Sequence, residues 1–240
     1  MSSLLRQTVE AHGGLERWHR LEMLTVKARF GGGLWGIKGQ AEIMAHELAV
    51  TVQLHREWTS HLPFGAPDHR TAVTPGRVLI ETTAGDVVEE LLNPRASFAG
   101  HTLYTPWTPP QLAYFIGYGM WNYLTFPFTF TLPGCRIAEL GAWEENGEIW
   151  QRMQVTFPDS IATHCPVQTY YVAPDGLIRR HDYDVDINGG TPGAHYFSGH
   201  ATVAGITLPT EHRIFIRNAD LTHEPEPLIV SIDVCDIEFS

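Results

Sequence analysis

The feature that most constrains the fold is a stretch in the middle of the chain, residues 96–135, that contains no Asp, Glu, Lys or Arg. Eleven of the 26 aromatic residues lie in it. A membrane-spanning helix is one alternative, but it needs about 20 mostly aliphatic residues, and this stretch is interrupted by five prolines and rich in Tyr and Trp. We favour a buried helix from Thr108 to about Thr125, because Thr108 can cap it, Pro109 suits its first turn and Pro127 prevents its continuation.

The sequence on either side consists mainly of short segments in which apolar and polar residues alternate, as in half-buried strands. Residues 2–21 are the exception, because their apolar side chains recur on one stripe of an amphipathic helix with a weak point at Gly13-Gly14. The remaining sequence up to residue 95 is expected to form strands, and later strands are expected at 150–157, 167–173, 177–187, 195–203, 206–217 and 228–239. We therefore predict an α+β fold, a strongly curved antiparallel β-sheet wrapped around a buried helix, with an N-terminal helix, as a single domain over residues 1–240.

The charge balance narrows the choice of partners. Sixteen basic and 27 acidic residues give a formal net charge of −11, and no compact group of Lys and Arg offsets it, so nucleic acids and anionic membranes are poor partners. Three widely separated cysteines, at 135, 165 and 235, fit neither a disulfide framework nor a Cys-x-x-Cys metal site. The first residues lack the basic and apolar regions of a secretory signal, so we expect a cytoplasmic location without membrane insertion. The oligomeric state stays open.

Several short motifs carry a resemblance to a known superfamily. They are Ala11-His12-Gly13-Gly14-Leu15-Glu16-Arg17-Trp18, which precedes a strand, and the late segments Asp175-Gly176-Leu177 and Gly205-Ile206-Thr207-Leu208-Pro209-Thr210. These motifs resemble those of the half-open β-barrels of the bacterial lipoprotein-carrier (LolA-like) superfamily. The chain also resembles an uncharacterised bacterial family that carries the run Tyr114-Phe115-Ile116-Gly117-Tyr118-Gly119-Met120-Trp121-Asn122-Tyr123-Leu124. The resemblance implies a concave sheet closed by helices around an apolar cavity.

Period-two alternation places several histidines on the concave face of the predicted sheet. In segment 177–187, Arg179, His181 and Tyr183 share one face, whereas the charged residues at 180, 182, 184 and 186 share the other, which we expect to face solvent. In segment 206–217, His212 shares a face with mainly apolar residues. One parity of segment 195–200 adds His195. Three neighbouring strands would then each contribute a histidine to one concave surface.

Three interpretations of these inward histidines remain open. A buried histidine can be a core residue whose ring nitrogens are bonded to the backbone or to a Tyr. A cluster suggests catalysis, in which one of the three histidines moves a proton while Tyr183 or Arg179 stabilises the resulting anion. Zinc or iron could use two of them, but the nearest carboxylates, Asp182 and Glu211, lie on the opposite face. We therefore predict no metal and no other cofactor.

The central helix offers the opposite wall of the site. Its candidates for contact with a ligand are Tyr114, Tyr118, Trp121 and Asn122, although an aromatic-rich core would show the same residues. Arg95, the last charged residue before the neutral stretch, is a candidate anchor for an anionic group.

These features lead to one functional hypothesis and one alternative. The hypothesis is that a large apolar cavity binds a small hydrophobic or aromatic molecule and that the histidines perform cofactor-independent acid/base chemistry on it, as in an isomerase, cyclase or lyase. The alternative is a non-catalytic carrier or binding protein for a lipid-like ligand, as the resemblance implies.

Overall fold

The computed structural model describes residues 1–240 and contains one antiparallel sheet of 13 strands in the order β6-β5-β4-β3-β2-β1-β15-β14-β11-β10-β9-β8-β7. Two further strands, β12 and β13, form a separate hairpin. The strands are β1 Met23–Gly31, β2 Leu48–Gln53, β3 Thr59–Leu62, β4 His69–Thr74, β5 Arg77–Thr82, β6 Val87–Leu92, β7 Arg136–Glu145, β8 Glu148–Thr156, β9 Val167–Val172, β10 Ile178–Val185, β11 Thr191–Ser198, β12 Ala201–Val203, β13 Ile206–Leu208, β14 Glu211–Ile216 and β15 Val230–Phe239.

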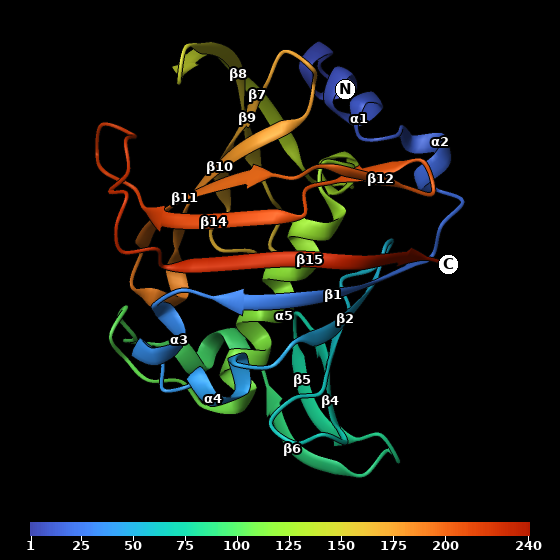
Figure 1. Ribbon diagram of the computed structural model, residues 1–240, viewed down its shortest axis with the longest axis vertical. Coiled ribbons are helices and arrows are strands. Elements are labelled where there is room, and N and C mark those ends of the chain that lie inside the picture. The colour runs from blue at the N-terminus through green and yellow to red at the C-terminus, as the bar shows by residue number, and fades with distance from the viewer.

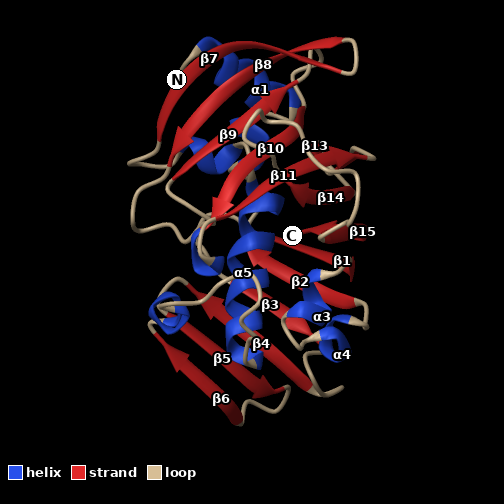
Figure 2. Cartoon of the chain, turned by 90° about the vertical axis from the view of Figure 1, so that its left-hand side faces the viewer, coloured by secondary structure: helices blue, strands red, loops and turns tan.

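The two ends of the chain meet in the middle of the large sheet. There β1 pairs with the last strand, β15. We call β1–β6 the first half-sheet, and β7–β11 with β14 and β15 the second half-sheet. Figures 1 and 2 show the sheet bending around helix α5 (Pro109–Thr125). The predicted fold, a strongly curved antiparallel sheet wrapped around a helix with another helix at the N-terminus, is confirmed.

Helix α5 begins and ends where its sequence requires. The Thr108 hydroxyl accepts a hydrogen bond from the backbone N–H of Gln111, and the Gln111 side chain accepts one from the N–H of Thr108. Pro109 occupies the first turn, and the helix stops before Pro127. Nearly all its residues are buried, because it lies on the concave side against β2–β6. None of the helices is both long and apolar enough to span a membrane.

The N-terminal helix is divided into α1 (Ser3–Ala11) and α2 (Leu15–Trp18). The break falls at the predicted weak point, Gly13-Gly14, where both residues have a positive φ. A Cβ atom on Gly13 would lie 2.2 Å from the carbonyl oxygen of Gly205, so only glycine allows the β12–β13 hairpin to approach this turn. The prediction of one continuous helix over residues 2–21 is therefore wrong.

Two further parts of the chain differ from the prediction. Two short helices, α3 (Leu34–Ile37) and α4 (Ala41–Met44), occupy a segment that was expected to form strands. Strand β7 is not among the predicted strands, although it pairs with β8 over its whole length. Most of its residues are exposed on both faces, so its sequence lacks the alternation that marks a half-buried strand. Three 3₁₀ helices complete the fold: η1 Pro94–Phe98, η2 Phe128–Thr131 and η3 Asp186–Asn188.

Candidate functional site

Histidines from three adjacent strands of the second half-sheet lie inside the molecule. His181 on β10 is directly opposite His195 on β11, and His212 lies on the next strand, β14. All three are at most 1% exposed, and Tyr183 is 4% exposed. The alternation therefore places these four side chains correctly. Their catalytic role stays a prediction.

The three histidines have incomplete hydrogen bonding. His195 Nε2 lies 3.0 Å from His212 Nδ1, and His181 Nε2 lies 2.5 Å from Oε1 of Gln168. The second ring nitrogen of each histidine is buried without a partner. An unpaired buried polar atom costs about 1–3 kcal/mol, so packing alone gives no reason for this cluster. No three His, Cys, Asp or Glu side chains are arranged to hold a metal ion.

A second polar group lies between α5 and the sheet, joined by three hydrogen bonds. The Tyr118 hydroxyl is 3.1 Å from His164 Nδ1, His164 Nε2 is 2.6 Å from the Tyr123 hydroxyl, and that hydroxyl is 3.3 Å from the hydroxyl of Tyr183. We call these four residues the tyrosine–histidine chain. The rings of His164 and Tyr183 are stacked with their centroids 4.0 Å apart. The Tyr123 ring also contacts His195, at 4.6 Å between centroids, so the chain and the three histidines form one network.

Sequence reasoning missed two members of this chain, His164 and Tyr123. His164 lies in the loop 157–166 between β8 and β9, where neither a helical nor a strand period assigns a direction to side chains. The signal that could have found it is the uncharged run Ile161–Pro166, which indicates burial of the loop. Tyr123 lies within the predicted helix, and a helical period alone gives no reason to choose it over the other tyrosines.

Burial keeps the network uncharged. Desolvation lowers the pKa of His164 and His212 to about 3 and holds the pKa of His181 and His195 well below the usual value. The same effect raises the pKa of the three tyrosines of the chain above the usual value. All seven side chains are therefore neutral at pH 7. Imidazoles with such low pKa values are weak bases near neutral pH.

The predicted ligand contacts on α5 have different surroundings. Tyr118 belongs to the tyrosine–histidine chain. Trp121 Nε1 donates a hydrogen bond to the carbonyl oxygen of Gln53 on β2, at 2.8 Å. Asn122 Nδ2 donates to the carbonyl oxygens of Tyr118 and Ala162, at 2.8 and 2.9 Å. The polar atoms of Trp121 and Asn122 thus fasten the helix to the sheet and to the loop 157–166.

Tyr114 and Arg95 line a different cleft, of about 280 Å³, together with residues of the loop 157–166. Arg95 Nη1 donates to the carbonyl oxygen of Thr163 at 2.8 Å, and Arg95 Nη2 lies 2.9 Å from Asp186 Oδ2. Arg95 therefore fastens the loop that carries His164, and its charge is balanced by a carboxylate. It makes no contact with the three clustered histidines.

The predicted alternation on β10 fails at the start of the strand. A bulge just before Arg180 shifts the pairing with β9. Arg179 lies 2.5 Å from the carboxylate of Asp175 and 2.9 Å from the ring of His200. The prediction that Arg179 joins His181 in an apolar lining is therefore wrong.

The outer face of β10 also differs from the prediction, because Arg180 and Asp182 are buried, with 1% and 3% exposure. Arg180 Nε and Nη2 bond to the two carboxylate oxygens of Asp182 at 2.7 and 2.9 Å, and its Nη1 lies 3.0 Å from Glu145 Oε2. The guanidinium also lies over the rings of Tyr171 and Tyr196. Glu145 comes from β7, the strand that the sequence did not predict. The two later acidic residues of the segment, at 184 and 186, are exposed as expected.

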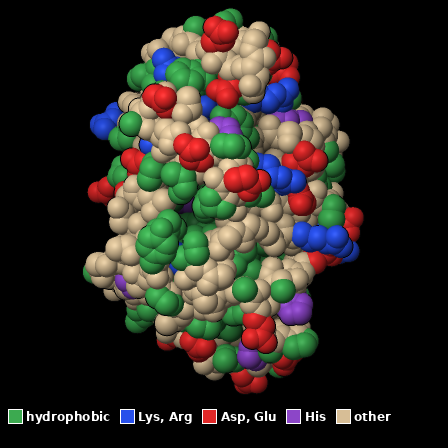
Figure 3. All heavy atoms as spheres, turned by 60° about the vertical axis from the view of Figure 1, so that its left-hand side comes forward, with side chains coloured by type: hydrophobic (Ala, Val, Ile, Leu, Met, Phe, Trp, Pro, Cys, Tyr) green, Lys and Arg blue, Asp and Glu red, His purple; other side chains and the backbone are tan.

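An apolar cleft lies between α5 and the concave face of the sheet, with a free volume of about 30 Å³. Ten of its 12 lining residues are hydrophobic, and the lining consists of Phe30, Trp35, Phe115, Ile116, Gly119, Met120, Tyr123, His164, Tyr183, Ile214, Val230 and Ile232. Figure 3 shows hydrophobic side chains around a hollow in the middle of one face of the molecule. The prediction of a large apolar cavity is wrong for this structure, because bulky side chains of α5 fill the space.

Comparisons with known proteins establish the fold. No protein-family model and no curated protein matches the chain. Among solved structures, a DUF1329 family protein from Desulfovibrio piger is similar, with 12% identity over 99% of this chain and 92% of that chain and a TM-score of 0.56. A LolA superfamily protein from Nitrosomonas europaea has 10% identity over 98% and 92% of the two chains and a TM-score of 0.54.

A third similar structure is a domain from Vibrio parahaemolyticus described as belonging to an outer membrane lipoprotein-sorting protein. It has 8% identity over 99% of this chain and 91% of that chain, with a TM-score of 0.50. The chain thus has the fold of the LolA-like half-barrels, and the resemblance inferred from its motifs is confirmed at the level of the fold.

Proposed function

We propose that the protein is a non-catalytic carrier or binding protein for a lipid-like molecule, which it holds between α5 and the concave face of the sheet. The observation that carries this proposal is the apolar cleft, whose lining comes from both half-sheets and from α5, for example Phe30, Ile214 and Met120. Converging apolar side chains with a few polar groups are typical of sites for lipophilic ligands. The shared fold with a LolA superfamily protein and with a lipoprotein-sorting domain supports the same proposal.

Binding requires the cleft to widen, because about 30 Å³ holds no more than one or two water molecules. Trp35, part of the lining, lies on α3, a four-residue helix outside the sheet. Directly after α3, Lys38 Nζ donates to the carbonyl oxygens of Thr102 and Thr105, at 3.0 and 3.2 Å, and to Asn188 Oδ1 at 2.7 Å. These bonds anchor the end of α3, so in this proposal the cleft widens through rotation of lining side chains such as Trp35, while α3 and the sheet stay in place.

The test measures binding of diphenylhexatriene, an uncharged hydrocarbon dye that fluoresces in apolar surroundings. We expect saturable binding by the wild-type protein and binding about tenfold weaker or worse by Gly119→Leu. A Cβ atom on Gly119 meets only the ring of Tyr123, at 3.7 Å, so the variant can fold while its longer side chain fills the cleft.

The matched control is Gly76→Leu, at an exposed turn where an added Cβ atom meets nothing within 4 Å. It should bind the dye like the wild-type protein. Equal binding by all three proteins would contradict the proposal.

Acid/base catalysis on the same ligand is the second candidate. The unpaired ring nitrogens of His181, His195 and His212 favour it, whereas the low pKa of the buried imidazoles weakens them as bases. The test loads the protein with a total lipid extract, recovers the bound compound by denaturing extraction and compares it with the input by mass spectrometry. An unchanged compound supports the carrier. A conversion that is lost in His181→Ala and His212→Ala supports an isomerase, cyclase or lyase.

A further inference from the structure

The apolar cleft has one polar end, where it meets the tyrosine–histidine chain. Tyr123, His164 and Tyr183 belong to its lining, and no charged side chain does. Tyr118, at the other end of the chain, is buried outside the lining. A ligand in the cleft can therefore contact the tyrosine–histidine chain only at the end of the chain that carries Tyr183.

No net charge faces this end of the cleft. Three guanidinium groups act on the network, and each is bonded to a carboxylate: Arg95 to Asp186 at 2.9 Å, Arg217 to Asp184 at 2.7 Å and Arg213 to Asp233 at 2.7 Å. Burial lowers the pKa of His164 to about 3 and raises the pKa of the tyrosines, so the chain itself is neutral at pH 7. A carboxylate or ammonium group of a ligand would be buried here without an opposite charge.

The tyrosine–histidine chain holds one proton more than its own hydrogen bonds use. Three hydroxyl groups and one neutral imidazole carry four protons and share three hydrogen bonds. When His164 is protonated at Nε2, Tyr118 donates to Nδ1, Nε2 donates to Tyr123, and Tyr123 donates to Tyr183, whose own O–H is then free. When His164 is protonated at Nδ1, the direction reverses and the free O–H is that of Tyr118.

We propose that the ligand carries an uncharged hydrogen-bond acceptor, the carbonyl or ether oxygen of an ester, ketone or ether. This oxygen accepts a hydrogen bond from the free O–H of Tyr183. This inference rests on the proposed function, because it specifies the ligand of the same cleft. An acceptor at this position favours the tautomer protonated at Nε2 and directs all the hydrogen bonds of the chain toward the cleft. A pure hydrocarbon leaves the free O–H without a partner, and a fatty-acid anion or an alkylammonium ion buries an uncompensated charge.

The test is competition against bound diphenylhexatriene with four ligands that each contain an unbranched ten-carbon chain: methyl decanoate, sodium decanoate, decane and decyltrimethylammonium. At pH 7.5 we expect the methyl ester to displace the dye at a concentration about tenfold lower than any of the other three ligands. This ratio corresponds to the free energy of one neutral hydrogen bond in a buried site.

Tyr183→Phe sharpens the test because it keeps the ring that stacks on His164 and removes only the hydroxyl. Whatever dye affinity this variant keeps, the ester and decane should displace the dye from it at similar concentrations, so that the advantage of the ester is lost. The matched control is Tyr171→Phe, because the hydroxyl that it removes bonds to Asp182 on the outer face of the sheet, at 2.8 Å. This variant should keep the advantage of the ester over decane.

The outcomes separate this inference from the proposed function. If the dye does not bind to the wild-type protein, both fail. If the dye binds but decanoate or the ammonium ion competes as well as the ester, the inference is overturned and the proposed function stands. The same holds if the ester keeps its advantage in Tyr183→Phe. Should that variant not fold, the ranking of the four ligands on the wild-type protein decides.

Discussion

Both half-sheets pack around α5, but their interior side chains differ in polarity. In the first half-sheet most interior side chains are apolar, such as Val50 and Val52, and its one buried histidine, His61, lies with Nδ1 2.7 Å from the Thr71 hydroxyl. In the second half-sheet the interior positions of three strands carry His181, His195 and His212. The curved shape therefore does not require a cluster of histidines, since the first half-sheet curves around α5 with only one. In the proposed function this polar network serves ligand recognition rather than folding.

The outer faces of the two half-sheets also differ, because only the second half-sheet buries charged residues there. On β2 of the first half-sheet, buried and half-buried residues alternate, as expected for a sheet with one solvated face. On β10 of the second half-sheet, residues 180–183 are buried on both faces. The first half-sheet thus carries its ion pairs in solvent, whereas the second encloses Arg180 and its two carboxylate partners.

The largest effect that separates the halves is expected on acidification. The second half-sheet and its loop 157–166 hold four buried histidines, and the first holds one, His61. The pKa of each lies below the unfolded value of about 6.5, so the unfolded chain binds protons first as the pH falls. The contribution of these imidazoles to stability is complete above about pH 6.5 and falls from there toward pH 3, by about 1.4 kcal/mol per pH unit for each imidazole.

Urea unfolding followed from pH 8 to pH 4.5 measures this loss, and hydrogen exchange locates it. We expect the amides of the second half-sheet to lose protection at a higher pH than those of the first. A free energy of unfolding that stays constant from pH 7 to pH 5 would contradict this account of the buried imidazoles.

The next largest effect is expected from Arg180→Met. The substitution keeps much of the side-chain volume but leaves Asp182 and Glu145 without their cation, so the free energy of unfolding should fall by about 3–5 kcal/mol. Urea unfolding at pH 7 is the measurement. A change below about 1 kcal/mol would show that the second half-sheet is as open to solvent here as the first.

A smaller effect is expected within the histidine cluster. His212→Leu leaves His195 Nε2 without a partner and should destabilise the protein by about 1–3 kcal/mol. The double variant His195→Leu/His212→Leu removes both partners and should be closer to the wild-type stability than the single variant. The comparison is made by urea unfolding at pH 8. If the double variant is instead the least stable, the imidazoles serve stability, and the contrast between the two interiors loses its functional meaning.

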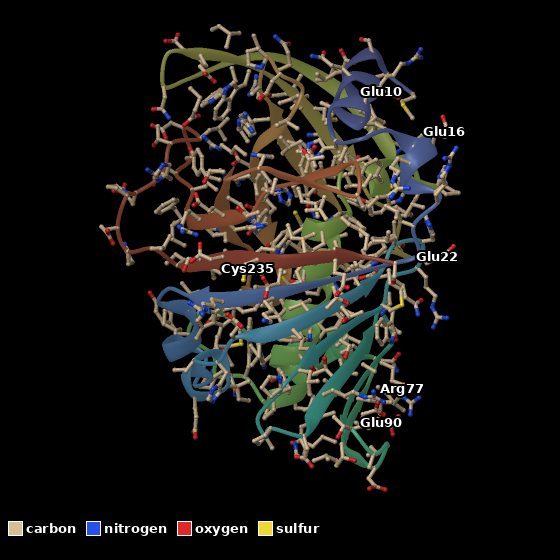
Figure 4. The ribbon with its side chains drawn as sticks, turned by 45° about the vertical axis from the view of Figure 1, so that its right-hand side comes forward. Glu10, Glu16, Glu22, Arg77, Glu90 and Cys235 are labelled. Carbon is tan, nitrogen blue, oxygen red and sulfur yellow. The ribbon has the colours of Figure 1, made fainter.

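The smallest effect is expected from Glu90→Gln in the first half-sheet. Arg77 Nε lies 2.6 Å from Glu90 Oε1, and both side chains are at least 40% exposed. Figure 4 shows the two residues together at the end of the first half-sheet. Solvent and salt screen such a pair, so the free energy of unfolding should change by less than about 1 kcal/mol. A loss comparable to that of Arg180→Met would remove the distinction between the two outer faces.

Local sequence signals predicted the elements that depend on few residues. Thr108, Pro109 and Pro127 define α5 because capping and proline effects act within one turn of a helix. The inward direction of His181 and His212 follows from the period of two along a strand. These signals require no knowledge of the neighbouring strands.

The remaining features depend on contacts between distant segments. The bulge before Arg180 ended the alternation that placed Arg179 inside, and burial of Arg180 depends on Glu145 of β7. His164 lies in a loop whose direction is fixed by Arg95, 69 positions earlier in the sequence. The volume of the cleft depends on how the side chains of α5 pack against both half-sheets, which no local pattern reports.

The pairing of β1 with β15 also determines at what point during synthesis the two half-sheets can join. Leu24 lies opposite Phe239, so the paired residues are 215 positions apart in the sequence. The ribosome therefore completes β1–β6, α5 and nearly all of the second half-sheet before the strand that joins the two halves exists. Until that strand arrives, β1 has a free edge, and such edges promote aggregation of nascent chains. Pairing of the ten residues of β15 with β1 is thus the closing step of folding, and contacts this distant in sequence make that step slow.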